Sequence, residues 1–256
     1  MRIAIVTGAS SGIGAEFARQ LDVDGLDGMW LVARRRQRLE TLAATLATPA
    51  RILPIDLADP AAISAIGARL KEEKPHVAWL INNAGFGKTG DFAELRLDDQ
   101  LAMVDVNVRA VTHLAHLVIP YMARGSCMVH VSSSASFQPL GAFAVYAATK
   151  AYVTSLSYAL AAELEHRGIH SVAVCPGPVD TEFGSVSRDG SGREKKLFAH
   201  KADVKAVVKK ALRDAKAGRW MSVFGFSINA LRFFSRLMPW RQVTRAAYRY
   251  VYVKTK

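Results

Sequence analysis

Tyr146 and Lys150 are spaced so that their side chains could handle a proton together. They stand four residues apart in a segment of helical periodicity, which places both side chains on one face, one turn apart. A neighbouring ammonium group favours the phenolate and lowers the phenol pKa from about 10 toward neutrality. Ser133 lies thirteen residues before Tyr146, after an apolar run, where its hydroxyl could hydrogen-bond a substrate oxygen as charge develops. The three residues predict general acid–base chemistry at an oxygen atom.

Residues 7–14, with the sequence TGASSGIG, are a second candidate for chemistry. They stand between an apolar run that predicts a first strand and a helical pattern that continues through Phe17 and Leu21. Glycines allow a tight turn, and the following helix N-terminus presents free N–H groups and a positive dipole end to a phosphate. The spacing of Gly8, Gly12 and Gly14 differs from the usual G-x-G-x-x-G. The pattern therefore favours a dinucleotide phosphate cradle and leaves a purely structural turn open.

Two further motifs indicate other chemistry and are disfavoured by their positions. Residues 8–12, GASSG, match the G-x-S-x-G turn of serine hydrolases, but only seven residues precede Gly8, too few for neighbouring strands and an oxyanion loop. Residues 82–89, NNAGFGKT, nearly match a P-loop, but Asn82 stands where the first glycine belongs. A serine hydrolase and a nucleoside triphosphatase are therefore disfavoured.

Three consecutive arginines indicate which dinucleotide the chain prefers. Residues 34–36 end the second predicted strand, about twenty residues beyond the glycine turn, where an NAD-binding chain places Asp or Glu on the ribose 2′-hydroxyl. Guanidinium groups suit a 2′-phosphate instead, because Arg presents a planar fork of donors. Arg34 and Arg35 therefore predict NADP(H) over NAD(H), whereas Arg36 and Arg38 are expected to be a solvated helix start.

The elements that must position these residues alternate along the chain. Six apolar, β-rich runs span residues 3–6, 30–33, 51–55, 77–81, 128–131 and 171–175, with helical patterns between them and a last strand expected near the C-terminus. Parallel strands need right-handed crossovers and cover on both faces. The sequence therefore predicts an α/β fold, a doubly wound Rossmann-type parallel sheet of about seven strands, with its ligand crevice at the carboxyl ends of the strands.

Two of the helices can be placed by the period of their apolar residues. The first has one predicted apolar face, formed by Val104, Val108, Val111, Ala115, Val118 and Met122. The second spans about residues 145–167 and carries a row formed by Tyr152, Leu156, Leu160 and Leu164. Tyr146 and Lys150 belong to this second helix.

Length and composition favour one domain covering residues 1–256. Half of the 256 residues are apolar, which is enough to bury one large core. The N-terminus does not resemble a signal peptide, and Cys127 and Cys175 are flanked by apolar residues, as buried structural thiols are. These features predict a cytoplasmic location. His113 and His116 lack companions at metal spacing, so no metal site is expected.

The C-terminal segment 219–256 is both apolar and basic. It holds eight Lys/Arg and no Asp or Glu, most of the formal net charge of +12, and its longest uncharged run of about twelve residues is shorter than a membrane span. We expect a last strand and helices that roof the pocket and contact a second subunit. The alternatives are a peripheral surface that docks on anionic lipid, which would suit a lipid-like substrate, or a surface for acidic partners. No nucleic-acid partner is expected.

Seven motifs follow one another between residue 3 and about Thr181. They are Thr7-Gly8-x-x-x-Gly12-x-Gly14, Asp56-Leu57, Asn82-Asn83-Ala84-Gly85, Asn107, Ser133, Tyr146-x-x-x-Lys150 and Pro176-Gly177-x-x-x-Thr181. In these motifs the sequence resembles the short-chain dehydrogenase/reductase family, in particular a bacterial subgroup of broad or unassigned specificity. Together with the glycine turn and the arginines, the resemblance implies a cofactor-binding set of Gly8, Ser10, Ser11, Gly12, Ile13, Gly14, Arg34, Arg35, Asp56, Leu57, Asn83, Ala84, Gly85, Tyr146, Lys150, Pro176, Gly177, Val179 and Thr181. It also implies a mobile substrate-covering loop at residues 183–201.

The same resemblance implies four catalytic residues. Tyr146 would be the general acid in reduction, with Lys150 lowering its pKa and binding the nicotinamide ribose. Ser133 would polarise the carbonyl, and Asn107 would anchor a water that relays protons. We therefore predict an oxidoreductase that moves a hydride between NADP(H) and a small carbonyl or secondary-alcohol substrate. The alternative is a non-catalytic NADP(H)-binding sensor or scaffold, and a homodimer or homotetramer is expected by analogy with the family.

Overall fold

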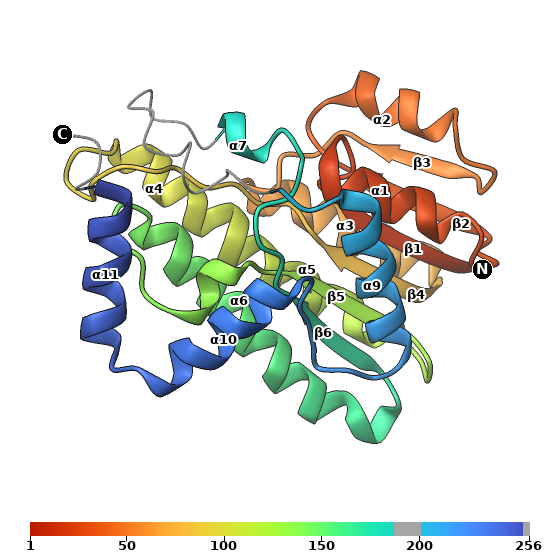
Figure 1. Cartoon of the computed structure of the whole chain (residues 1–256). Coiled ribbons are helices and arrows are strands. Elements are labelled where there is room, and N and C mark those ends of the chain that lie inside the picture. Colours follow the sequence, from red (N-terminus) through yellow and green to blue (C-terminus); the bar gives the residue numbers. More distant parts are fainter. Residues whose placement is uncertain (187–200, 253–256) are drawn as a thin grey trace.

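The strands form one parallel sheet, as the alternation of elements predicts. A computed structural model describes residues 1–186 and 201–252, and its sheet has the order β3-β2-β1-β4-β5-β6-β7 (Figure 1). The strands are β1 (Arg2–Thr7), β2 (Gly28–Val32), β3 (Ala50–Leu53), β4 (His76–Asn82), β5 (Cys127–Val131), β6 (His170–Val174) and β7 (Met221–Ser222). The chain builds outward from β1 to β3 and then crosses back to β4, which is the topological switch of a doubly wound sheet. The predicted fold class is confirmed.

Helices cover both faces of this sheet. One face is covered by α1 (Gly12–Leu21), α2 (Arg36–Ala43) and α9 (Val204–Lys216), and the other by α3 (Pro60–Glu73), α5 (Ala110–Val118) and α6 (Ala144–Leu164). The remaining helical elements are α4 (Leu97–Val104), the π-helix η1 (Asp105–Arg109), the 3₁₀ helices η2 (Ile119–Tyr121), η3 (Ser134–Phe137) and η4 (Glu165–Arg167), and the helices α7 (Phe183–Val186), α10 (Phe226–Leu237) and α11 (Trp240–Tyr252).

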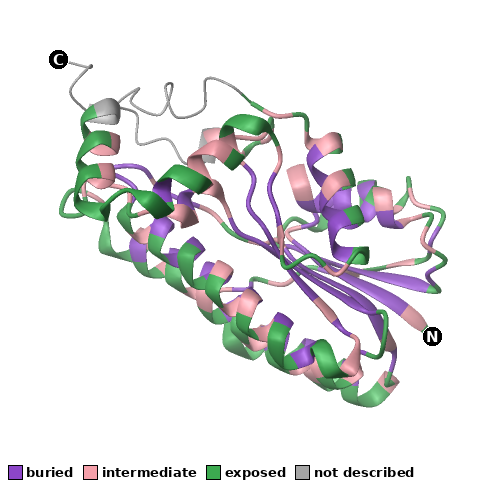
Figure 2. Cartoon of the chain, turned by 60° about the horizontal axis from the view of Figure 1, so that its bottom comes forward, coloured by how far each residue is buried: buried purple, intermediate pink, exposed green. Residues whose placement is uncertain are grey.

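Successive side chains of each strand point into opposite layers. In β1, Ala4 and Val6 pack among the helices of one face, whereas Ile3 and Ile5 pack among those of the other. Apart from the edge strands β3 and β7, the strands are therefore largely buried on both sides (Figure 2). Because both faces exclude water, the strands are continuous apolar runs, which is why their positions can be predicted from the sequence.

The helix that carries Asn107 departs from the predicted apolar face. Asp105–Arg109 form a π-helix, whose wider turn shifts the register of the side chains that precede it. Met103 and Asn107 are buried, while Val104 is exposed. The predicted face is therefore wrong at Val104 and holds from Val111 onward, because a period of 3.6 residues does not reveal a π-turn.

Helix α6 buries a different face from the predicted row of apolar residues. Tyr152 is exposed, and Leu156 and Leu160 are half-buried. The buried side chains are Tyr146, Ala147, Thr149, Lys150, Val153, Ser157, Ala161 and Leu164. Apolar residues stand on several sides of this helix, so periodicity could not select its buried face. The face that is buried turns both Tyr146 and Lys150 toward the sheet.

One helical run has the length and composition of a membrane span. Leu97–Tyr121 joins α4, η1, α5 and η2, with a mean hydropathy of 1.2 in its most apolar window, 39% of which is buried. Its side chains Ala110, Leu114 and Val118 pack against the sheet in the core. We therefore interpret this run, the single candidate among residues 1–186 and 201–252, as a core helix.

The segment expected to cover the substrate is described only in part. Residues 183–186 form α7, and residues 187–200 of the expected loop lie outside the described residues. Val179 and Ala202 form a β-bridge on either side of this segment. The expected last strand is the two-residue β7, which pairs with β6.

Asp24 connects four elements at the amino ends of the strands and provides a test of the fold. Its carboxylate accepts a 2.6 Å hydrogen bond from Trp79 Nε1 and forms ion pairs with Lys216 and Arg2. Burial raises the pKa of Asp24, but the hydrogen bonds from Lys216 and Trp79 and the charges of Lys216 and Arg2 outweigh burial and lower it below the ordinary 3.8. The ionised carboxylate therefore stabilises the fold above that pH, and this stabilisation is lost as the pH falls through the lowered value.

We expect the substitution Asp24→Asn to lower the free energy of unfolding by about 1–3 kcal/mol at pH 7, because it removes charge-assisted hydrogen bonds from a half-buried site. Urea denaturation at a series of pH values measures the difference. The difference in the free energy of unfolding between the wild type and the variant should become smaller as the pH falls below 3.8, where the wild-type carboxylate begins to be protonated. Asp98→Asn, at an exposed ion pair with Arg96, is the matched control and should change stability little.

Candidate active site

A cavity of about 940 Å³ lies at the carboxyl ends of the strands. The predicted site residues in its lining are Gly8, Ser10, Ser11, Gly12, Ile13, Arg34, Arg35, Asp56, Leu57, Asn83, Ala84, Gly85, Ser133, Tyr146, Lys150, Pro176, Gly177, Val179 and Thr181. Gly14 and Asn107 lie behind the lining rather than in it. Residues spread over most of the chain are thus gathered in one place, because parallel strands end at the same edge of the sheet.

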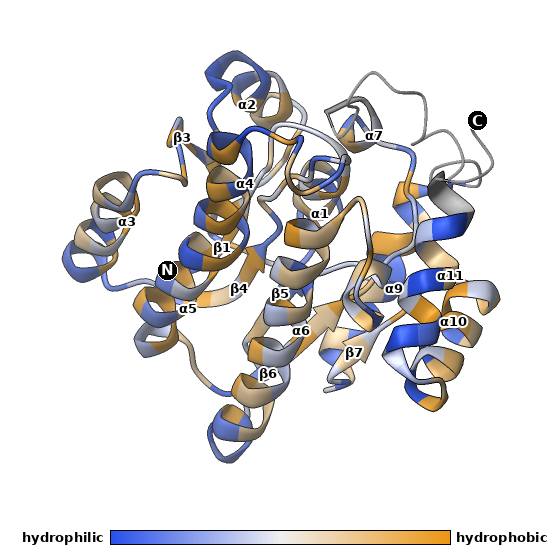
Figure 3. Ribbon diagram, turned by 90° about the vertical axis from the view of Figure 1, so that its left-hand side faces the viewer, coloured by the Kyte–Doolittle hydropathy of each residue, from blue (hydrophilic) through white to orange (hydrophobic). Residues whose placement is uncertain are grey.

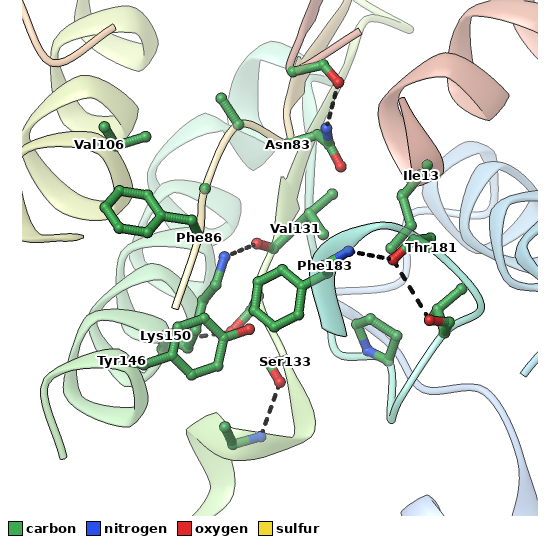
Figure 4. A pocket seen from close by; sticks show the side chains of 18 of the residues that line it. Ile13, Asn83, Phe86, Val106, Val131, Ser133, Tyr146, Lys150, Thr181 and Phe183 are labelled. Atoms are coloured by element: carbon green, nitrogen blue, oxygen red, sulfur yellow. Dashed lines mark hydrogen bonds between the residues drawn. The ribbon is translucent and has the colours of Figure 1, made fainter. Parts of the chain in front are cut away.

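The glycine turn is pressed against the turn that follows β4. Thr7 Oγ1 donates to the Ile81 carbonyl and accepts hydrogen bonds of 3.0 Å from the backbone N–H groups of Asn83 and Ala84. In return, Asn83 Nδ2 donates to the Thr7 carbonyl at 2.9 Å. It also lies 3.4 Å from the Gly8 carbonyl (Figure 4). A Cβ on Gly14 would lie 2.4 Å from the backbone oxygen of Gly8, so only glycine fits there. Gly14 is therefore a packing residue of the turn.

Tyr146 and Lys150 lie side by side, but their environment differs from the predicted one. The Lys150 ammonium lies 5.7 Å from the centroid of the Tyr146 ring and donates a 2.8 Å hydrogen bond to the Val131 carbonyl (Figure 4). Burial raises the pKa of Tyr146 to about 12, and the neighbouring Ser133 hydroxyl offsets only part of this rise. Burial also lowers the pKa of Lys150 to about 8. Burial therefore dominates the pKa of the phenol in this arrangement, and the lowering of that pKa by Lys150 stays a prediction.

Two neighbouring serines after β5 have different environments. Ser132 is buried, and its hydroxyl contacts the Lys150 carbonyl at 2.8 Å and the Thr154 hydroxyl at 2.7 Å. Ser133 is half-buried, caps the 3₁₀ helix η3, and accepts a 3.1 Å hydrogen bond from the Ala135 N–H. The hydroxyl of Ser133 faces the side of the cavity where Tyr146 lies (Figure 4). Of the two serines, Ser133 is the one whose hydroxyl lies beside Tyr146.

Asn107 joins the turn after β4 to helix α6. Its Oδ1 accepts a hydrogen bond from Phe86 N–H at 3.1 Å, and its Nδ2 donates to the Phe86 carbonyl and to Thr149 Oγ1. The π-helix turns this fully buried amide toward the site. A Cβ on Gly85 would lie 2.8 Å from Asn107 Oδ1 and 3.2 Å from Lys150 Nζ. Asn107 therefore supports the backbone beside Lys150 from behind.

The acidic side chain of Glu182 forms ion pairs with two of the arginines, Arg35 and Arg38. Arg35 donates to Glu182 and, at 3.0 and 2.9 Å, to the hydroxyls of Ser10 and Ser11. Arg38 also pairs with Glu182, while its side chain stays exposed on α2 as expected for a solvated helix start. Hydrogen bonds from Arg38 and Arg35 lower the pKa of the Glu182 carboxyl. The cluster thus holds an anionic group beside the glycine turn.

The other two arginines of this region lie farther from the glycine turn. Arg34 lies 3.9 Å from the carboxylate of Asp56 at an exposed position, where both line the cavity. Arg36 pairs with Glu40 in its own helix at 3.6 Å, as a solvated helix start does. The four arginines of residues 34–38 therefore differ in what they face, although the sequence presents them as one basic run.

Several residues of the site were missed by sequence reasoning. The ring of Phe143 stacks on Tyr146 with centroids 4.3 Å apart, and Phe183 of α7 lies 5.5 Å from the same ring. Spacing could have indicated Phe143 and Arg38. Phe143 stands three residues before the predicted Tyr146, and Arg38 stands three residues after the predicted Arg35, which is the spacing of neighbours on a helix. Phe183 falls at the start of the predicted loop 183–201, whereas no local signal marks Glu182 as a partner of Arg35 and Arg38.

The C-terminal helices form one wall of the cavity, as expected for segment 219–256. Ile228 and Leu231 of α10 and Ala247 of α11 line it. Helix α11 is held by Tyr248, whose hydroxyl donates to Asp91 Oδ1 at 3.2 Å and whose ring covers Gly141. The roof of the site therefore comes from the part of the chain beyond the seven motifs.

This fold and site define a class of protein. The family profile described as short chain dehydrogenase matches residues 2–191, so the chain belongs to that family. An uncharacterized oxidoreductase of Staphylococcus epidermidis is 31% identical over 200 residues, covering 77% of this chain and 86% of the relative. Sulfoacetaldehyde reductase 2 of Chromohalobacter salexigens is 32% identical over 194 residues, covering 73% and 77%. A short-chain dehydrogenase of Sphingobium yanoikuyae, solved in complex with NADPH, is 30% identical, with a TM-score of 0.80 and 96% of each chain covered.

The buried ammonium of Lys150 provides a test of the site that does not depend on activity. Its pKa, lowered from 10.5 to about 8, means that the unfolded chain binds a proton more tightly than the folded one between those values. The cost of burying the charge is therefore fully present below pH 8 and disappears as the pH rises toward 10.5. The hydrogen bond to the Val131 carbonyl offsets part of this cost.

We expect Lys150→Met to raise the free energy of unfolding by about 2 kcal/mol at pH 7, the balance between the burial cost and the lost hydrogen bond. The gain should fall toward zero between pH 8 and 10.5. Urea denaturation at pH 7 and pH 10 measures both values, with Lys71→Met on the exposed side of α3 as the control. If Lys150→Met lowered the free energy of unfolding at pH 7 while Lys71→Met did not, the result would contradict the claim that the buried Lys150 charge destabilises the fold.

Proposed function

We propose that this chain is an NADP(H)-dependent carbonyl reductase or alcohol dehydrogenase with Tyr146, Ser133 and Lys150 as its catalytic residues. The observation that carries the proposal is that these three residues and the glycine turn line one cavity at the switch point of the sheet. The relative named sulfoacetaldehyde reductase supports an aldehyde or ketone as the substrate. A nicotinamide cofactor bound in this cavity would supply or accept the hydride.

Two features of the cavity fit a dinucleotide phosphate. The glycine turn brings backbone N–H groups of α1 to the lining, and Ser11 at the N-cap leaves those groups without a side-chain cap. Arg35 donates hydrogen bonds to the hydroxyls of Ser10 and Ser11 and to an anion, the carboxylate of Glu182. A 2′-phosphate could take the place of that carboxylate on the two guanidinium groups of Arg35 and Arg38. This cluster is the support for NADP(H) over NAD(H).

The protonation of Tyr146 suits the donation of a proton. Because burial holds its pKa near 12, the phenol keeps its proton at neutral pH and can give it to a carbonyl oxygen that gains charge. Ser133 would hydrogen-bond the same oxygen. Lys150 would bind ribose hydroxyls, and its ammonium would stabilise the phenolate left by proton transfer. The phenol of Tyr146 is thus in the protonation state that reduction of a carbonyl group requires.

Asn107 would act as a positioning residue in this mechanism. Both ends of its amide are engaged by Phe86 and Thr149, and this bridge holds the backbone beside Lys150. The water relay that the family resemblance implies at Asn107 stays a prediction. A homodimer or homotetramer with α6 at an interface and a cytoplasmic location also stay predictions.

Removing the Tyr146 hydroxyl tests the catalytic assignment. We expect Tyr146→Phe to lower NADPH-dependent turnover of ketones by at least about 10²-fold, because the proton donor is lost. The rise in melting temperature on adding NADPH should remain. Tyr152→Phe, an exposed position on the same helix, is the matched control and should keep its activity.

The assay would follow NADPH oxidation across aldehydes and small, aromatic and steroid ketones. Turnover by the wild type that Tyr146→Phe retains would overturn the role of Tyr146. Stabilisation of the wild type by NADPH, without turnover on any member of the panel, would favour the alternative of a non-catalytic cofactor sensor or scaffold.

Arg35 and Arg38 test the choice of dinucleotide. We expect the double substitution Arg35→Ala, Arg38→Ala to weaken NADPH binding by about 10- to 100-fold, the effect of losing charge-assisted hydrogen bonds to phosphate. NADH binding should change much less, because NADH lacks the 2′-phosphate. Arg36→Ala, which removes the arginine paired with Glu40, is the control. Isothermal titration calorimetry measures both affinities, and tighter binding of NADH by the wild type would refute the preference for NADP(H).

A further inference from the structure

Helix α10 presents an apolar face to the outside of the molecule. Phe226, Phe233 and Leu237 stand at helical spacing on one side and are 91%, 61% and 66% exposed. Ile228 and Leu231, on the opposite side of the same helix, line the cavity. A surface helix normally turns its polar side outward. The outward apolar face of α10 therefore needs a partner.

The apolar face continues around the turn into α11. Phe234, Met238 and Trp240 are also exposed, and Trp240 begins the second helix. We call these exposed side chains the apolar elbow: Phe226, Phe233, Phe234, Leu237, Met238 and Trp240. Figure 3 shows α10 and α11 together at one end of the molecule, with α3 toward the opposite end. The apolar elbow thus spans two consecutive helices that also line the cavity.

Exposed arginines flank the apolar elbow. Arg236 and Arg241 stand next to it, and Arg245 and Arg249 continue along the outer side of α11. Within residues 1–186 and 201–252, none of these four arginines forms an ion pair. The sequence from 219 to 256 has no Asp or Glu to neutralise them. This surface is therefore complementary to a negatively charged partner.

We propose that the apolar elbow docks on the surface of an anionic lipid bilayer. Helices that lie in a bilayer interface combine an apolar face of Phe, Leu and Trp with Lys or Arg at its borders, which is the arrangement of α10 and α11. Arginine stems pack along the apolar boundary while the guanidinium groups reach the phosphates. Trp240 stands at the border between the two kinds of side chain, where indole rings are favoured in membrane interfaces.

A second copy of this chain fits the same surface less well. A twofold contact brings each patch against its own copy, so Arg236 and Arg241 of one subunit would meet those of the other. Like charges brought together in this way repel, and no carboxylate in the segment 219–256 compensates them. The charge of the surface thus favours lipid phosphates over a symmetric dimer.

Docking at this place has a consequence for the substrate, which rests on the proposed function. Because α10 forms both the docking face and a wall of the cavity, the bound protein holds that wall close to the bilayer. Near Tyr146 the cavity is lined by the apolar side chains of Phe86 and Leu140, and Leu231 of α10 lines the same cavity. Carbonyl compounds that partition into lipid are therefore the substrate class that docking favours.

Co-sedimentation with vesicles tests the docking surface. The full chain is mixed with vesicles of phosphatidylcholine and phosphatidylglycerol, or of phosphatidylcholine alone. We expect binding to the anionic vesicles that weakens with added salt. The double substitution Arg236→Glu, Arg241→Glu should weaken binding by at least about tenfold, since each basic side chain at an anionic surface contributes to it. Phe233→Ser, Leu237→Ser should weaken binding to a similar degree.

Matched variants elsewhere on the molecule control for charge and hydropathy. Arg69→Glu, Lys71→Glu on α3 makes the same change of charge at the opposite end, and Val23→Ser removes an exposed apolar side chain in the loop after α1. Both should bind vesicles like the wild type. All four variants should keep the stabilisation by NADPH and the turnover of a water-soluble ketone, which separates loss of docking from failure of the proposed function.

The proposal is overturned by three results. The first is that the wild-type protein stays in solution with anionic vesicles at low salt. The second is that the elbow and control variants lose binding equally. The third is that Phe233→Ser, Leu237→Ser converts an oligomer into a monomer, measured by light scattering, while vesicle binding is absent; the elbow would then be a contact between copies of this chain.

Discussion

The hydroxyl of Thr7 joins the ends of β1 and β4, and the site depends on this connection. One side chain donates to the Ile81 carbonyl and accepts from two N–H groups of the next turn, so both turns are held at fixed separation. The glycines then let the first turn approach so closely that no Cβ fits at Gly14. A shift of either strand end would separate the glycine turn from the residues that follow β4 and β5.

Burial governs the chemistry of the residues on the other side of the cavity. Burial raises the pKa of Tyr146 and lowers the pKa of Lys150, because a low-dielectric environment disfavours the charged form of both. The Val131 carbonyl and the Ser133 hydroxyl only partly compensate. At neutral pH the pair therefore carries the single positive charge of Lys150, and a bound cofactor or substrate that changes its surroundings has a large effect on both groups.

The C-terminal helices show how one element can serve two surfaces. Their inner sides complete the cavity through Ile228, Leu231 and Ala247. Their outer sides carry exposed aromatic rings and arginines. The seven motifs end at about Thr181, so the parts of the chain that meet the substrate and the exterior are those about which family membership says least.

The sequence by itself determined the sheet, the glycine turn and the spacing of Tyr146 and Lys150, because strands buried on both faces and a strand–turn–helix unit leave local patterns. Only the tertiary structure decided the buried face of α6, the π-turn that aims Asn107, and the meeting of Arg38 with Glu182. These features arise from contacts between distant segments, which no local period encodes. The pKa of Tyr146 was also decided only by the tertiary structure, since spacing reveals a neighbouring charge but not how deeply both side chains are buried.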